Sequence, residues 1–153
     1  MNDKSNVVCV FMLEDVLLDL DSMYRQFTQD TKGSVYQFLK YGEPIEFSVE
    51  TLKAMFSRGY DIAVLTYAEE EYLPEIEKWI AKHVNKRVAN NLYKIYTTSN
   101  ASHFTKVMMM TEIQRRMLKD VMFLVDSIDI DVPELNRLGI NVYVLNKATW
   151  SQS

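Results

Sequence analysis

The fold is decided by residues 7–24, Val-Val-Cys-Val-Phe-Met-Leu-Glu-Asp-Val-Leu-Leu-Asp-Leu-Asp-Ser-Met-Tyr. The run from Val7 to Leu13 is entirely apolar and rich in β-branched residues. A run this short predicts a strand buried on both faces, which is typical of the centre of a parallel sheet. Open α/β sheets bind their ligands beyond the carboxyl ends of the strands, so the end of this strand is where we expect a functional site. Acids crowd that end: Glu14, Asp15, Asp19 and Asp21.

Apolar runs alternate with amphipathic stretches along the rest of the chain. Further strands are predicted over residues 61–66, 93–97, 121–125 and 140–145. Helical spacing covers four segments: residues 48–58, a stretch that begins at Pro74, residues 105–118, and a short segment after Asp131. Ser48 is the expected N-cap of the first. This alternation predicts an α/β fold: a three-layer, Rossmann-like architecture with a parallel five-stranded sheet and helices on both faces.

Composition narrows the class of protein. A chain of 153 residues predicts a single domain over residues 1–153 with a sizeable core. The net charge of −4 gives no electrostatic footprint for nucleic acid or an anionic membrane, so we expect neither partner. Cys9 is the only cysteine and lies inside the first apolar run, which predicts a buried thiol. No apolar stretch approaches the roughly 18 residues of a membrane span, and we expect a cytoplasmic protein.

The first motif resembles that of the haloacid dehalogenase (HAD) superfamily, in which a hydrophobic strand runs into Phe-Asp-Leu-Asp-Gly-Val-Leu-Val-Asp-Ser. Met12 stands where that family has its nucleophilic aspartate, and Glu14 stands where it has the general acid. A thioether cannot form the acyl phosphate intermediate of carboxylate-mediated phosphoryl transfer. The resemblance therefore implies a phosphatase frame in which Met12 and Glu14 are vestigial catalytic positions. The residues that match the family pattern are Phe11, Leu13, Val16, Leu17 and Asp19.

Three further motifs extend the resemblance over most of the chain, about residues 7–145. The run Gly59–Thr66 is similar to the second motif, whose terminal hydroxyl and neighbouring amide hold the substrate phosphate. Lys106 matches the third motif, a lysine that neutralises the phosphate. The resemblance thus implies that Thr66 and Lys106 are phosphate-binding residues.

The fourth motif is a strand that ends in acids for Mg²⁺. Asp126 ends such a strand, Ser127 replaces the second acid, and Leu138-Gly139-Ile140 follows at matching spacing. Asp126 and Glu14 are therefore the remaining metal candidates. Mg²⁺ requires an octahedral set of oxygen ligands, and Met12 and Ser127 have removed two of them. We therefore expect no cofactor; if the protein does bind one, we expect Mg²⁺.

Residues 19–47 are the least regular part of the chain. Helical spacing at Met23, Tyr24 and Phe27, and again at Tyr36 and Leu39, predicts one or two short helices. The HAD family inserts a cap at this place. The resemblance therefore implies a small helical cap over residues 19–47 and a rather open crevice.

Simpler interpretations stand beside these. Met12 fits a buried core residue, and the four acids fit solvated loop acids and helix N-caps. A rival register uses Asp19 and Asp21 as the catalytic pair after the apolar Val16 to Leu18.

We expect a catalytically degenerate HAD-like protein that binds a partner protein or a small anionic ligand. The alternative is a Mg²⁺-dependent phosphohydrolase of small phosphorylated metabolites or nucleotides. It would use Asp19 and Asp21, or a site around Glu14, Asp15 and Asp126. Homo-oligomerisation stays open, as does the identity of the ligand.

Overall fold

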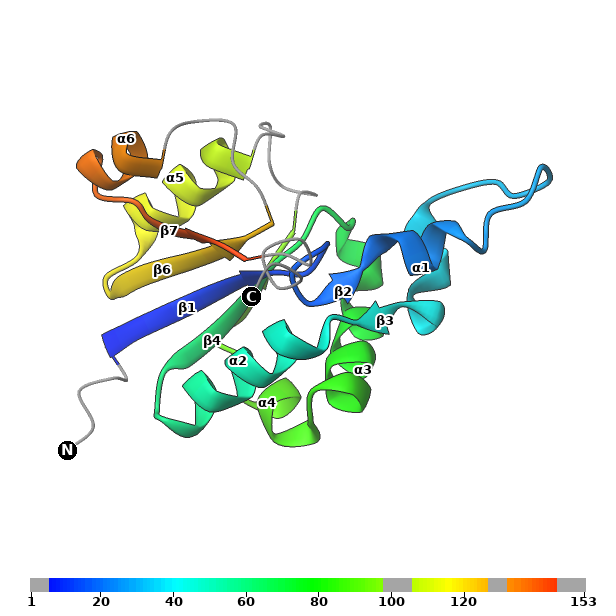
Figure 1. The fold of residues 1–153 in the computed structure, drawn as a ribbon, viewed down its shortest axis with the longest axis horizontal. Helices are drawn as coiled ribbons and strands as arrows, with labels where there is room; N and C mark the ends of the chain where they lie inside the picture. The colour runs from blue at the N-terminus through cyan, green and yellow to red at the C-terminus, as the bar shows by residue number, and fades with distance from the viewer. Residues whose placement is uncertain (1–5, 98–105, 127–131, 146–153) are drawn as a thin grey trace.

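The computed structural model describes residues 6–97, 106–126 and 132–145. Its centre is a parallel five-stranded sheet in the order β5-β4-β1-β6-β7 (Figure 1). The predicted three-layer α/β fold and all five predicted strands are confirmed. The strands are β1 (Val7–Met12), β4 (Asp61–Leu65), β5 (Lys94–Tyr96), β6 (Asp120–Val125) and β7 (Asn141–Val144).

Strand β1 occupies the middle of this sheet. It pairs with β4 on one side, from Val8 opposite Asp61 to Met12 opposite Leu65. It pairs with β6 on the other side, from Val7 opposite Asp120 to Phe11 opposite Leu124. Residues 8–12 are at most 1% exposed. The continuous apolar run is explained by this position, because both faces of the strand are covered.

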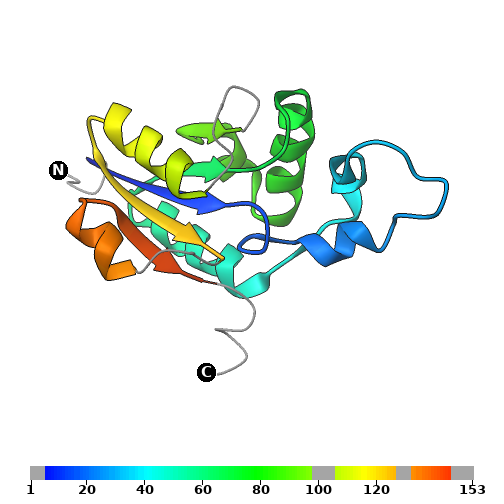
Figure 2. The same cartoon turned by 90° about the horizontal axis from the view of Figure 1, so that it is seen from above.

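Helices cover the two faces of the sheet (Figure 2). On one face lie α3 (Leu73–His83), α4 (Lys86–Asn90) and α5 (Lys106–Arg116). On the other lie α2 (Glu46–Ser57) and α6 (Val132–Arg137). Each long helix turns an apolar stripe inward, as its spacing predicts. The buried residues of these stripes include Val49 and Leu52, Ile76 and Ile80, and Met110 and Ile113.

Two helix starts differ from the prediction. Helix α2 begins at Glu46, with Ile45 as an N-cap that makes no side-chain hydrogen bond, so Ser48 lies inside the helix and does not cap it. The Ile45 amide is instead held by the carbonyl of Leu17 at 2.8 Å, which fixes the entry of the chain into α2. Helix α4 was not predicted; the Asn85 side chain caps it by accepting from the Val88 amide at 2.7 Å. Thr105, the predicted start of the helix before β6, lies outside the described residues.

An insert projects from the sheet between β1 and α2 (Figures 1 and 2). It contains α1 (Leu20–Tyr24) and the 3-10 segment η2 (Val35–Tyr41), which account for the helical spacing of residues 19–47. A short antiparallel ribbon closes its base, made of β2 (Leu18–Asp19) and β3 (Glu43–Pro44). The ribbon was not predicted, because two-residue strands leave no periodic pattern.

Among the described residues, no helix combines the length and the apolar character that crossing a membrane requires.

Candidate functional site

The strand register brings three predicted site positions to the carboxyl edge of the sheet. Met12 ends β1 opposite Leu65, so Thr66 is the next residue on the neighbouring strand. On the other side Phe11 pairs with Leu124, which places Asp126 just beyond the level of Met12. Adjacent strands are about 4.8 Å apart, so the three backbones converge within a few strand spacings.

Met12 is buried, with 1% of its surface exposed, and belongs to the hydrophobic core. A buried thioether carries no charge and offers no oxygen to a metal ion. At the position where the HAD pattern has its nucleophile, this chain therefore has a core side chain.

The turn after β1 determines where the next acid points. The Leu13 amide still bonds to the Leu65 carbonyl at 2.8 Å, and the Leu17 and Leu18 amides then fold back onto the Leu13 carbonyl. Asp15 takes a positive φ of 61°, which a non-glycine residue rarely adopts, and its carboxylate accepts from the Leu20 amide at 3.0 Å. This compact turn carries Glu14 inward.

Glu14 is 4% exposed, so its description as a solvated loop acid is wrong. Its Oε2 accepts hydrogen bonds from the Thr66 hydroxyl at 2.6 Å and from the Tyr67 amide at 3.0 Å. The hydroxyl of Tyr36, in η2 of the insert, donates to the same oxygen. The other oxygen, Oε1, is buried and finds no hydrogen-bond partner among the described residues.

The hydrogen-bond direction at Thr66 can be assigned. Thr66 is fully buried, and its hydroxyl oxygen accepts from the Ala68 amide at 3.1 Å. Its own hydrogen is therefore free to point at Glu14. The hydroxyl and the following amide, the pair that the second HAD motif uses to hold phosphate, hold the Glu14 carboxyl group in this chain.

Burial dominates the electrostatics of this cluster. Desolvation raises the pKa of Glu14, and the hydrogen bonds from Thr66 and Tyr36 oppose that rise only in part. The pKa of Tyr36 is also raised, by burial first and by the neighbouring Glu14 next, so its phenol keeps its proton and acts as a donor. The sequence placed Tyr36 in a predicted short helix and did not mark Tyr67; neither was expected at the site, because no periodicity connects them with Glu14 across the intervening chain.

Lys106 and Asp126 form a second polar contact at the same edge. Lys106 Nζ lies 2.5 Å from Asp126 Oδ1, and the two side chains are 15% and 27% exposed. The sequence assigned these residues to separate motifs, and the fold brings them together. Ser127, the expected replacement of a metal acid, lies outside the described residues.

The residues present do not fit Mg²⁺. Met12 offers no oxygen, Glu14 Oε2 already accepts three hydrogen bonds, and Lys106 neutralises Asp126. Within residues 6–97, 106–126 and 132–145, no three His, Cys, Asp or Glu side chains are grouped to hold a metal. A divalent ion with oxygen ligands would need several of these contacts to rearrange.

The rival register around Asp19 and Asp21 is wrong. Asp19 lies in β2, within the two-stranded ribbon and outside the parallel sheet. Its side chain caps α1 by accepting from the Asp21 amide at 3.2 Å, and Asp21 is an exposed first-turn acid. Both acids therefore serve the start of the insert.

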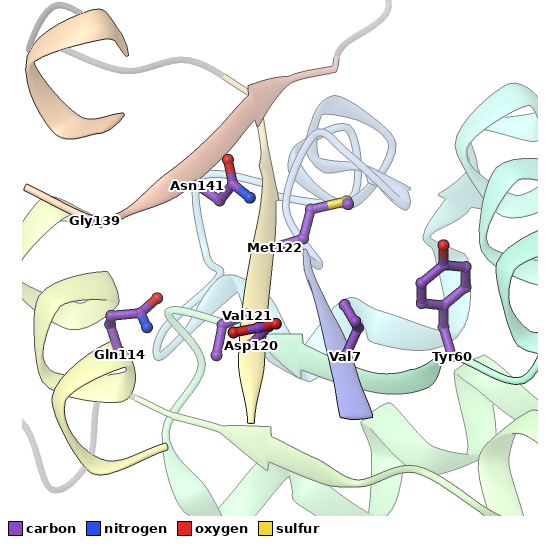
Figure 3. Close-up of a pocket in the computed structure, with 8 residues that line it drawn as sticks. All are labelled: Val7, Tyr60, Gln114, Asp120, Val121, Met122, Gly139 and Asn141. Carbon is purple, nitrogen blue, oxygen red and sulfur yellow. The ribbon is translucent and has the colours of Figure 1, made fainter. Parts of the chain in front are cut away.

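A cavity of about 280 Å³ lies at the opposite, amino edge of the sheet (Figure 3). Val7, Asp120 and Asn141, from the starts of β1, β6 and β7, line it together with Tyr60 and Gln114. It lies at the other end of the strands from Glu14 and takes no part in the carboxyl-edge cluster.

No protein-family model matches the sequence, and no curated protein matches it. Solved structures, in contrast, match the fold of this chain. A chain of the Pnkp1/Rnl/Hen1 complex superposes on 94% of this chain with a TM-score of 0.66 and 14% identity; this chain spans only 47% of that one. A second match is a HAD-superfamily hydrolase of subfamily IA from Geobacter sulfurreducens. This match covers 94% of this chain and 88% of the hydrolase, with a TM-score of 0.59 and 9% identity.

A HAD family enzyme from Bacteroides thetaiotaomicron, solved with magnesium and inorganic phosphate, gives a TM-score of 0.54 at 13% identity. That match covers 90% of this chain and 92% of the enzyme. At such low identities the likeness concerns the fold. The chain has a HAD-like fold.

Proposed function

We propose that this chain is a catalytically inactive HAD-like protein that acts by binding, through its carboxyl-edge site, either a partner protein or a small anionic ligand. The observation that carries the proposal is Met12. Phosphoryl transfer through a carboxylate needs an ionised oxygen in line with phosphorus, and a buried thioether supplies none.

The surroundings of Met12 support the same proposal. The residue two positions on, Glu14, is engaged by Thr66, Tyr67 and Tyr36, so its carboxyl group is not free to move protons for a substrate. Asp126 is paired with Lys106. Glu14 Oε2 and Asp126, the remaining candidates at this edge, are thus already committed to neighbours.

The insert supports a role in binding. It projects beside the carboxyl edge and displays Tyr24 and Tyr41, which are 50% and 46% exposed. Tyr24 stacks on Phe27, and Phe38 contacts both Phe27 and Tyr41, so the four rings form one continuous aromatic row. Exposed tyrosines of this kind are common in contact surfaces because they combine apolar area with a polar tip.

Hydrolysis of an aryl phosphate, with and without Mg²⁺, tests the loss of catalysis. The wild-type protein and Asp126→Ala are expected to give the same turnover, with no dependence on Mg²⁺. Met12→Asp/Glu14→Asp, which restores the two family carboxylates, serves as the matched control for the assay conditions. Mg²⁺-dependent turnover by the wild-type protein that disappears in Asp126→Ala would overturn the proposal and establish the phosphohydrolase.

A further inference from the structure

The Glu14 side chain occupies two hydrogen-bond donors at the end of β4. A hydroxyl and the next backbone amide at the end of β4 converge on one oxygen, at 2.6 and 3.0 Å. Both donors lie at the carboxyl edge of a parallel sheet, where α/β proteins bind ligands. In this chain the oxygen that they bind belongs to the protein itself.

The occupant fits these groups imperfectly. Glu14 Oε2 accepts three hydrogen bonds, while Oε1 is buried with no partner among the described residues. A buried polar oxygen without a partner is energetically unfavourable. Three donors therefore hold Oε2, while the burial of Oε1 is not offset by any hydrogen bond among the described residues.

The third donor comes from a different part of the molecule. Tyr36 belongs to η2, and its hydroxyl reaches Glu14 across the base of the insert. Its ring also lies against Tyr72, with the centroids 5.9 Å apart. Glu14 is consequently the shared partner of the sheet edge and of the insert.

We propose that Glu14 is a built-in competitor for an oxyanion: its carboxyl group fills the Thr66 and Tyr67 donors, and an external phosphate or carboxylate group binds there only when Glu14 withdraws and releases Tyr36. This inference rests on the proposed binding function and specifies its ligand chemistry and its regulation. The oxyanion can belong to a small molecule or to a side chain of a partner protein, because the donors recognise the same oxygens in both.

Glu14→Ala tests this directly, since it removes the group that acetate would replace. Inorganic phosphate and acetate are titrated into the variant and the wild-type protein at constant ionic strength, with thermal unfolding and calorimetry as readouts. Each anion should bind Glu14→Ala at least about tenfold more tightly than wild type and should raise its unfolding temperature selectively. Comparison with wild type removes the general stabilisation that phosphate gives to any protein.

Two matched variants locate the effect. Glu14→Ala/Thr66→Val removes the hydroxyl donor and should lose the gained affinity. Glu14→Gln keeps the shape of the side chain, so this variant should bind phosphate and acetate no more tightly than wild type does. Anion binding by Glu14→Ala that persists unchanged in the Thr66→Val background would place the ions elsewhere and overturn the inference.

Tyr36→Phe covers the case in which Glu14→Ala does not fold. It keeps the ring against Tyr72 and removes only the hydroxyl that holds Glu14. Weaker retention of Glu14 should raise the affinity for phosphate above that of wild type. No gain in Tyr36→Phe or Glu14→Ala would refute the built-in competitor.

The two proposals fail separately. Mg²⁺-dependent phosphatase activity of the wild-type protein would overturn the binding function and would leave a gain of anion affinity in Glu14→Ala intact. An inactive wild-type protein whose Glu14→Ala variant ignores phosphate and acetate would overturn the competitor alone.

Discussion

Met12 and Glu14 leave the same strand end, and both side chains turn into the protein. The first is apolar and simply fills space, whereas the second is a polar group whose burial is offset by three donors. Replacing either one therefore changes a different free-energy contribution: packing at position 12 and hydrogen bonding at position 14. Substitutions at Met12 and at Glu14 measure these two contributions separately.

Met12→Asp should lower the free energy of unfolding by roughly 2–4 kcal/mol, because it places a carboxylate in a position with 1% exposure. Met12→Leu keeps the volume and should cost less than about 1.5 kcal/mol. Urea denaturation of both variants measures the difference. Equal stability of the two variants would show that solvent reaches position 12.

Glu14→Gln should reveal a dependence of stability on pH. Burial raises the pKa of Glu14 above its ordinary 4.5, so the unfolded chain loses this proton at lower pH than the folded protein does. The contribution of Glu14 to stability is then complete below pH 4.5 and declines as the pH rises through the folded pKa. The free energy of unfolding of wild type relative to Glu14→Gln should therefore fall with increasing pH. A difference that rises with pH would assign Glu14 a depressed pKa instead.

The sequence predicted the chemistry of these residues better than their surroundings. The lack of charge at Met12 follows from its identity alone. The burial of Glu14 depends on the turn at Asp15 and on Tyr36, a contact that forms only when the insert folds over the strand end. No local pattern contains that information.

The insert is attached to the rest of the molecule at several points besides the Glu14–Tyr36 contact. Trp79 of α3 donates from Nε1 to the Gly42 carbonyl at 2.9 Å, and Trp79 is 3% exposed. Gly42 lies against Leu18, so a Cβ at this position would come within 2.7 Å of the Leu18 side chain. The β2–β3 ribbon and α3 thus fix the base of the insert. Arg25, at the end of α1, still pairs with Glu43 of β3 at 3.4 Å. The loop between α1 and η2, which contains the exposed Lys32, extends away from the ribbon and α3.

Trp79→Phe should loosen the insert. The Gly42 carbonyl loses its buried donor, which lowers stability by about 1–3 kcal/mol. Trypsin cleavage after Arg25 and Lys32, followed by mass spectrometry, should accelerate more than cleavage in the sheet. Tyr24→Phe is the control, because it alters an exposed aromatic of the same insert. Uniform acceleration over the whole chain would contradict a local effect.

The buried apolar side chains of the described residues form a hydrophobic core, and β1 runs through it. The strands around β1 could be predicted because burial on both faces demands unbroken apolar runs. Helix α4 and the β2–β3 ribbon could not be predicted, because they are too short to show a period and are fixed by contacts distant in sequence. The parallel direction of the strands followed from their alternation with helices, whereas their order in the sheet was not predicted.

Cys9 reports on this core. The thiol is fully buried in β1, and burial, with a smaller effect of Asp61, raises its pKa to about 11. A disulfide reagent should therefore label the folded protein only after global unfolding, at a rate that rises with urea as the unfolding equilibrium does. The urea-unfolded chain provides the reference rate. Labelling of the native protein at that reference rate would show that β1 opens without unfolding.

The central place of β1 also has a consequence for synthesis. Its partner β4 emerges from the ribosome early, but β6 follows more than 100 residues after Val7. The nascent chain must therefore carry its most apolar strand with one edge unpaired while most of the protein is still being made. Such an edge is a template for intermolecular pairing, so crowded polysomes and fast overexpression should favour aggregation of unfinished chains over that of the completed protein.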